Sequence, residues 1–107
     1  MPAHGDTVDE FRVGTVEVTV RHSCIRRDMY ELRRGESLPS GVVDRLRARG
    51  QVKADSPALL IVEVPGVHRL TVAPNVGRVV VMPKLATERP DQREAAVAVA
   101  ELNAAQA

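Results

Sequence analysis

The residues best suited to metal binding or catalysis are three histidines and one cysteine. His22 and Cys24 stand two positions apart, a spacing that could place two metal ligands at one strand end. A structural zinc site needs about four ligands and a catalytic one about three, so His68 and a distant acid would have to complete the set. We therefore expect no metal site and no cofactor, with His22 in a loop and Cys24 as a small buried thiol.

The same pair offers a second chemistry, a cysteine nucleophile beside a histidine base. Arg21, Arg26 and Arg27 are close to Cys24 in the sequence and would lower the pKa of its thiol. Catalysis would also need an orienting group and an oxyanion site, and the sequence shows neither. The acidic residues are scattered, and the isolated glycines form no phosphate-binding loop. We therefore expect a protein that is not an enzyme.

Basic residues form the other chemical cluster. Residues 21–53 hold nine Lys or Arg against four Asp or Glu, whereas the whole chain carries a net charge of only +1. Such a local stripe can bind phosphate, but it can equally be a solvated face with internal ion pairs. The basic-patch candidates are Arg33, Arg34, Arg45, Arg47 and Arg49. We expect weak, non-specific nucleic-acid binding at most.

Composition restricts the classes of protein further. The 107 residues suffice for one domain, and with 2% aromatic against 44% apolar residues the core must be built from Val, Leu and Ala. The scarcity of rings disfavours recognition by stacking. A single cysteine excludes an internal disulfide. The first residues lack the apolar run of a signal peptide, and no segment reaches the roughly 20 apolar residues that span a bilayer. We therefore expect a cytoplasmic product without membrane contact.

Alternation of apolar and polar residues with a period of two predicts an antiparallel sheet. A helix over 40–50 is expected to end at Gly50, and 90–105 forms a second helix. Three of the strands, joined by short turns, make a meander, and 78–82 is apolar on both faces and hence central. The predicted strands are 11–20, a strand around Tyr30 and Leu32, 51–53, 58–64, 67–73 and 78–82.

The first half of the chain also carries a recognisable order of short motifs. They are Val16-Glu17-Val18-Thr19-Val20, Tyr30, Gly35-Glu36-Ser37-Leu38-Pro39, Val42-Val43, Leu46 and Gly50-Gln51-Val52. Over about residues 13–54 this order resembles a small SH3-like module of tailed-bacteriophage head and head–tail virion proteins. The second half has no counterpart in the minimal module, and two arginines crowd the turn at Gly35. The resemblance implies a head–tail connector or capsid-associated protein, located in the virion.

Together these features predict a mainly β, α+β domain: a small, SH3-like, partly open barrel with one internal helix and a C-terminal helix. Residues 1–10 are expected to form a flexible arm, 11–84 the β-rich domain, and 85–107 a linker and the last helix. The predicted core is Val16, Val18, Val20, Leu32, Val43, Leu46, Leu60, Val62, Leu70, Val72, Val79 and Val81.

The C-terminal helix is the expected contact surface. Residues 95–100 are apolar nearly all round, whereas a helix lying on one sheet needs a single apolar stripe. We therefore expect a structural protein that assembles with itself or with neighbouring structural proteins. The interface candidates are Phe11, Val97, Val99 and Leu102. The alternative is an SH3-like nucleic-acid-binding or regulatory module that uses the basic stripe over 21–53.

Overall fold

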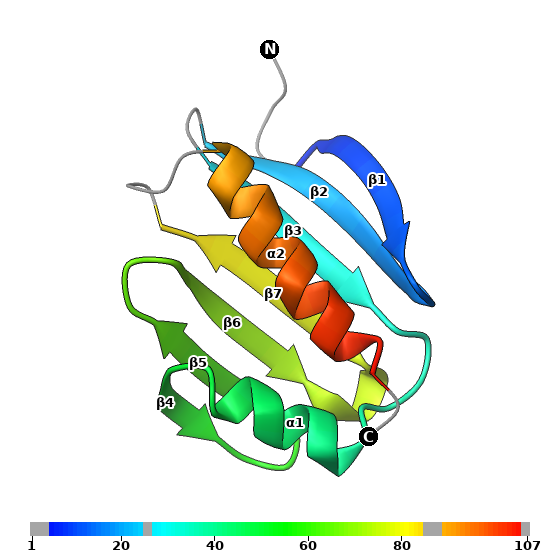
Figure 1. Ribbon diagram of the computed structural model, residues 1–107, viewed down its shortest axis with the longest axis vertical. Helices are drawn as coiled ribbons and strands as arrows, with labels where there is room; N and C mark the ends of the chain where they lie inside the picture. The colour runs from blue at the N-terminus through cyan, green and yellow to red at the C-terminus, as the bar shows by residue number, and fades with distance from the viewer. Residues whose placement is uncertain (1–4, 25–26, 85–88, 106–107) are drawn as a thin grey trace.

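Seven strands form one antiparallel sheet in the computed structural model, which describes residues 5–24, 27–84 and 89–105 (Figure 1). Strand accounts for 47% and helix for 27% of these described residues. The strands are β1 (Thr7–Val13), β2 (Val16–Cys24), β3 (Arg27–Arg33), β4 (Gln51–Asp55), β5 (Leu60–Val64), β6 (His68–Ala73) and β7 (Arg78–Pro83). Their order in the sheet is β1-β2-β3-β7-β6-β5-β4.

Two meanders build this sheet and meet at its centre. The first consists of β1, β2 and β3, and the second runs inward from the far edge through β4, β5, β6 and β7. The two join where β3 pairs with β7, from Tyr30 opposite Val81 to Arg33 opposite Arg78. The sheet stays open, in agreement with the partly open barrel that the sequence predicts. The prediction that 78–82 is a central strand is confirmed by the place of β7.

Both helices pack on the same face of the sheet. The helix α1 (Ser40–Arg47) links β3 to the edge strand β4, and α2 (Arg89–Asn103) lies across the middle strands (Figure 1). A short 3-10 helix, η1 (Pro74–Val76), joins β6 to β7. The core lies between the helices and the sheet, so the molecule has two layers.

The core has the composition that the sequence predicts. Every predicted core residue is buried except Val43, which is half-buried, while its neighbour Val42 is fully buried. Ala96, Val99 and Ala100 of α2 complete the core from the helical side. One strand face is therefore covered on β2, β3, β5, β6 and β7, and alternation leaves every second residue of these strands on the opposite face.

The predicted strand over 11–20 is in fact two strands. Gly14 and Thr15 form a two-residue hairpin loop between the paired residues Val13 and Val16. Gly14 has φ of 59°, and it occupies the first loop position, where hairpin turns of type II′ take glycine. The alternation continues on both sides of this turn, which is why the sequence pattern did not reveal the break.

The predicted arm over residues 1–10 is wrong for residues 7–10. These residues form the first half of β1 and pair with β2, although their side chains are exposed. Backbone hydrogen bonds to an open sheet edge hold them, and these bonds leave no hydrophobic signal in the sequence. Residues 1–4 and the predicted linker over 85–88 lie outside the described residues.

The prediction that α2 is apolar nearly all round is also corrected. Its buried stripe consists of Gln92, Ala96, Val99, Ala100 and Asn103, and the opposite side carries charged residues. The helix is therefore amphipathic, with small alanines rather than large apolar residues toward solvent. In the described part of the chain, no helix has the length and apolar character to cross a membrane.

Candidate functional site

The structure describes two of the three histidines. His22 lies on β2 with Nδ1 4.0 Å from a carboxylate oxygen of Asp28, and His68 lies on β6 on the core side. His4 and the side chain of Cys24 are outside the described residues. Within that described part, no group of three or more His, Cys, Asp or Glu side chains is placed to hold a metal ion.

His68 is a buried histidine in an unusual setting. Only 1% of its surface is exposed, and neither ring nitrogen has a hydrogen-bond partner among the described residues. Burial, reinforced by the charge of Arg49, lowers the pKa of His68 to about 4. His68 is therefore neutral at physiological pH and contributes to the core rather than to proton transfer.

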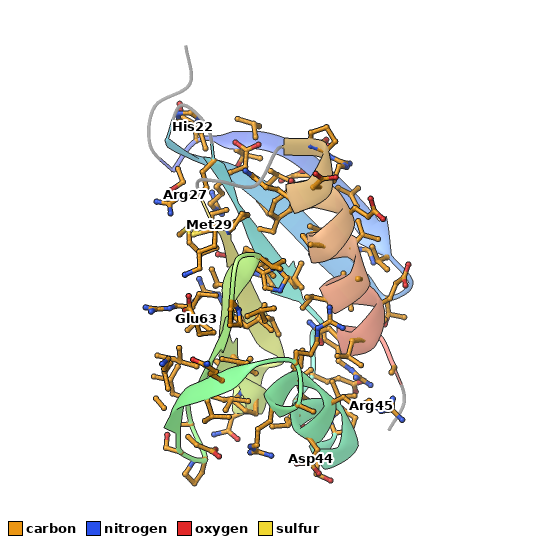
Figure 2. The ribbon with its side chains drawn as sticks, turned by 60° about the vertical axis from the view of Figure 1, so that its left-hand side comes forward. His22, Arg27, Met29, Asp44, Arg45 and Glu63 are labelled. Carbon is orange, nitrogen blue, oxygen red and sulfur yellow. The ribbon has the colours of Figure 1, made fainter. Side chains whose placement is uncertain are left out.

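The five basic-patch candidates do not form one surface. Arg45 and Arg49 are exposed on the α1 side of the molecule, where Figure 2 shows Arg45 beside Asp44. Arg47 is neutralised in an ion-pair network, 2.5 Å from Asp44 and 3.0 Å from Asp55. These three acidic and basic side chains line a hollow of about 550 Å³ between α1 and the loop after β4.

Arg34, another of the basic-patch candidates, stabilises the fold rather than forming part of a basic surface. Its side chain is buried, and its Nη1 donates to the backbone oxygens of Asn103 at 2.9 Å and Ala105 at 2.7 Å. Carbonyls at a helix end have no intrahelical partner, and a cation there is favourable. Arg34 therefore ties the C-terminal end of α2 to the segment after β3, and it is not available as part of a basic surface.

The face of the sheet opposite the helices is uncovered, and we call it the open sheet face. In Figure 2, Arg27, Met29 and Glu63 project from it, on the side away from α2. Its central row, in register across five strands, is Thr19, Glu31, Val80, Thr71 and Ile61. The remaining members are Arg21, Arg27, Met29, Arg33, Glu63, Arg69, Arg78, Met82 and Lys84.

Glu31 lies at the centre of the open sheet face and is only 3% exposed. Three arginines surround its carboxylate: Arg78 at 2.9 Å, Arg21 at 4.0 Å, and Arg33 in direct contact. Burial alone would raise the pKa of Glu31, but the hydrogen bond and charge of Arg78, with the charges of Arg33 and Arg21, bring it below its usual value. The carboxylate of Glu31 is thus the shared counter-charge of three arginines.

A second carboxylate, Glu63, repeats this imbalance on β5. Arg69 donates to it at 2.8 Å, and Lys84 makes a direct ion pair with its other oxygen. With Arg27, the open sheet face holds six basic side chains and two carboxylates. The same face also carries Glu10 and Arg12 of the edge strand β1, and Arg12 is paired with Glu17 of β2 at 2.6 Å, so the face keeps a surplus of positive charge.

No family model, curated protein or solved structure matches the chain.

The exposed side of α2, which we call the α2 outer side, has the opposite character. Its exposed residues are Pro90, Asp91, Arg93, Glu94, Ala98 and Glu101. Most of them, with half-buried Val97, line an open hollow of about 580 Å³. Arg93 is paired with Asp9 at 2.8 Å, whereas no ion pair within the described residues joins Glu94 or Glu101. The α2 outer side therefore carries unpaired acids around a small apolar centre.

The four predicted interface residues differ in how much of their surface is exposed. Val99 has no exposed surface and belongs to the core, which corrects its place among the contact candidates. Phe11 and Leu102 are half-buried and packed against the core, and the guanidinium of Arg93 lies 4.2 Å above the Phe11 ring. Val97 lines the hollow on the α2 outer side, and Phe11 lines a separate hollow beside β1 and β2.

Sequence reasoning missed the half of the open sheet face that comes from the second meander. Arg69, Arg78 and Lys84 lie outside the basic stripe over 21–53. Their signal was present in the alternation, because Arg69 stands on the opposite strand face from its neighbour Leu70. These residues share a face with the basic residues of the first meander only because β3 pairs with β7, and alternation does not predict that pairing.

Proposed function

We propose that this chain is a non-enzymatic structural protein that acts through protein–protein contacts, with copies of itself or with neighbouring structural proteins. The observation that supports this most is the open sheet face of a two-layer fold. Half-buried Val80 of its central row and half-buried Met29 and Met82 of the adjacent row provide apolar surface between charged side chains. Apolar surface bordered by charged residues is the usual anatomy of a protein interface.

The setting that we propose is a virion of a tailed bacteriophage, with the protein as a head–tail connector or capsid-associated component. This part rests on the resemblance of residues 13–54 to SH3-like modules of such particles. The open, mainly antiparallel sheet is compatible with that resemblance. Proteins of this kind work as rings or lattices of identical copies, which need two different contact surfaces on each copy.

The test is whether the purified protein associates. Light scattering over a range of concentrations, alone and with the products of adjacent genes, should detect particles larger than the monomer. Capsid, portal or tail genes beside its own gene would support the virion setting. A protein that stays monomeric at every concentration and joins none of these products would end the proposal.

A second candidate function, nucleic-acid binding, is favoured by the positive surplus of the open sheet face. Seven basic side chains against four carboxylates, with Arg12, Glu10 and Glu17 included, could attract a phosphate backbone. Retention on heparin, and a steep loss of binding to single-stranded DNA as salt rises, would support this candidate. Arg69→Glu should then weaken binding, because Arg69 is about half exposed.

A further inference from the structure

Two surfaces of this chain are complementary in charge and lie on opposite faces of the molecule. The open sheet face has more cations than carboxylates, and the α2 outer side presents Glu94 and Glu101, which have no ion pair among the described residues. We propose that the α2 outer side of one copy docks on the open sheet face of the next. This inference rests on the proposed function and names both the partner, a second copy, and the surfaces that meet.

The spacing of the acids on α2 fits such a contact. Glu94, Ala98 and Glu101 follow each other at i, i+4 and i+7, so they form one stripe along the helix. An apolar patch, Val97 with Ala98, separates the two carboxylates. The helix can therefore place an apolar centre on the sheet while each end carries a negative charge.

The open sheet face offers the matching pattern. Thr71, Val80 and Ile61 lie side by side in its central row and are half-buried, so they can accept an apolar patch. Arg33 and Arg78 lie directly opposite each other on one side of that row, with Glu31 as their only shared carboxylate in the described structure. A carboxylate from a second copy would supply the counter-charge that this arginine pair lacks.

The dimensions permit the contact. Fifteen residues of α2 span about 22 Å, and the molecule measures 39 × 27 × 21 Å along its principal axes. Figure 1 looks down the shortest axis and shows α2 in front of the sheet, so the two surfaces are separated along the thinnest dimension. A contact between opposite faces is heterologous, and it repeats from copy to copy into a ring or a filament.

A second copy is favoured over nucleic acid because the open sheet face has no ring for base stacking. The chain has one Tyr, one Phe and no Trp. Tyr30 is buried in the core, and Phe11 lies under Arg93 on the helical side. Single strands bind to sheets largely through aromatic stacking, whereas a carboxylate needs only the arginines.

The test uses two blocking variants and their mixture. Ala98→Arg places a long cation in the middle of the α2 outer side, and Thr71→Arg does the same at the centre of the open sheet face. Each variant alone should weaken self-association by at least about tenfold. Sedimentation velocity measures this at protein concentrations up to about 1 mM, because a contact made by one short helix is small and therefore weak. An equimolar mixture should form a heterodimer and nothing larger. The Thr71→Arg variant keeps an intact α2 outer side, which can dock on the intact open sheet face of the Ala98→Arg variant, and the heterodimer then has only blocked surfaces left.

Two controls keep the result interpretable. Val76→Arg changes an exposed residue in the turn between β6 and β7 that belongs to neither surface, and should associate as the wild type does. If Thr71→Arg fails to fold, Arg69→Glu tests the same face through an exposed side chain. Raising the salt concentration should weaken the wild-type association as well.

The possible failures separate the two proposals. If the wild type associates and Ala98→Arg and Thr71→Arg associate equally well, the docking model is overturned while the proposed function survives. If the wild type stays monomeric alone but joins products of adjacent genes, the second copy is the wrong partner. If it neither associates nor joins them, both proposals fail. Binding of single-stranded DNA without self-association, abolished by Arg69→Glu, would favour the nucleic-acid alternative.

Discussion

Arg33 and Arg78 lie directly opposite each other across β3 and β7, although like charges in that position repel. Glu31 contacts both guanidinium groups and is almost fully buried. Its carboxylate therefore holds the centre of the open sheet face together, at the junction of the two meanders.

The Glu31→Gln variant should accordingly be less stable than the wild type by about 1–3 kcal/mol, because Arg33 and Arg78 lose the carboxylate that they share. Urea denaturation followed by circular dichroism measures this difference. The matched control is Glu17→Gln, which breaks the exposed pair with Arg12 and should cost less than about 1 kcal/mol. Equal, small losses in the two variants would contradict the role given to Glu31.

His68 should make the protein less stable in mild acid. Its pKa is about 4 in the folded protein against 6.5 as the ordinary value, so the unfolded chain binds the proton more tightly. The contribution of His68 is therefore complete above about pH 6.5 and is lost as the pH falls toward 4, by about 3 kcal/mol in all.

The measurement is the free energy of unfolding between pH 4 and 7, for the wild type and for His68→Leu. The difference between the two curves isolates His68 from the acids that titrate in the same range. Leu suits the site because the strand neighbours, Val64 and Pro83, are apolar. A difference that does not change with pH would show that His68 keeps its ordinary pKa.

Removing the Arg34 side chain should loosen the end of α2. Arg34→Met deletes two hydrogen bonds to backbone oxygens, and the expected loss is about 2–4 kcal/mol because the donor is charged and buried. Amide hydrogen exchange should accelerate near the end of α2. Arg45→Met, on the exposed side of α1, should change stability by less than about 0.5 kcal/mol. Unchanged exchange at the end of α2 would exclude this anchoring role.

The two valines of α2 should respond differently to the same substitution. Val99→Asp places a charge in the core, where Val99 has no exposed surface, and should cost more than about 4 kcal/mol or prevent folding. Val97→Asp changes a half-buried residue at the surface hollow and should leave the fold intact. Circular dichroism and thermal unfolding compare them, and similar behaviour of both variants would mean that α2 is turned differently.

The sequence by itself determined most of the core and the class of the fold. Val16, Val18 and Val20, like Leu70 and Val72, alternate with polar residues, and a period of two admits only one arrangement on a sheet with one covered face. The turns after Val64 and Ala73 were also predictable, because Pro and Gly restrict the backbone locally. These signals are local in the chain, so a single sequence contains them.

Tertiary structure alone decided which residues share the open sheet face. Arg33 and Arg78 are 45 positions apart, and they meet only because the second meander returns to pair β7 with β3. The rotation of α2, which buries Val99 and leaves Ala98 exposed, depends on the shape of the sheet beneath it, since alanines and valines give the helix little asymmetry of their own. Long-range pairing and packing, unlike alternation, have no counterpart in neighbouring residues.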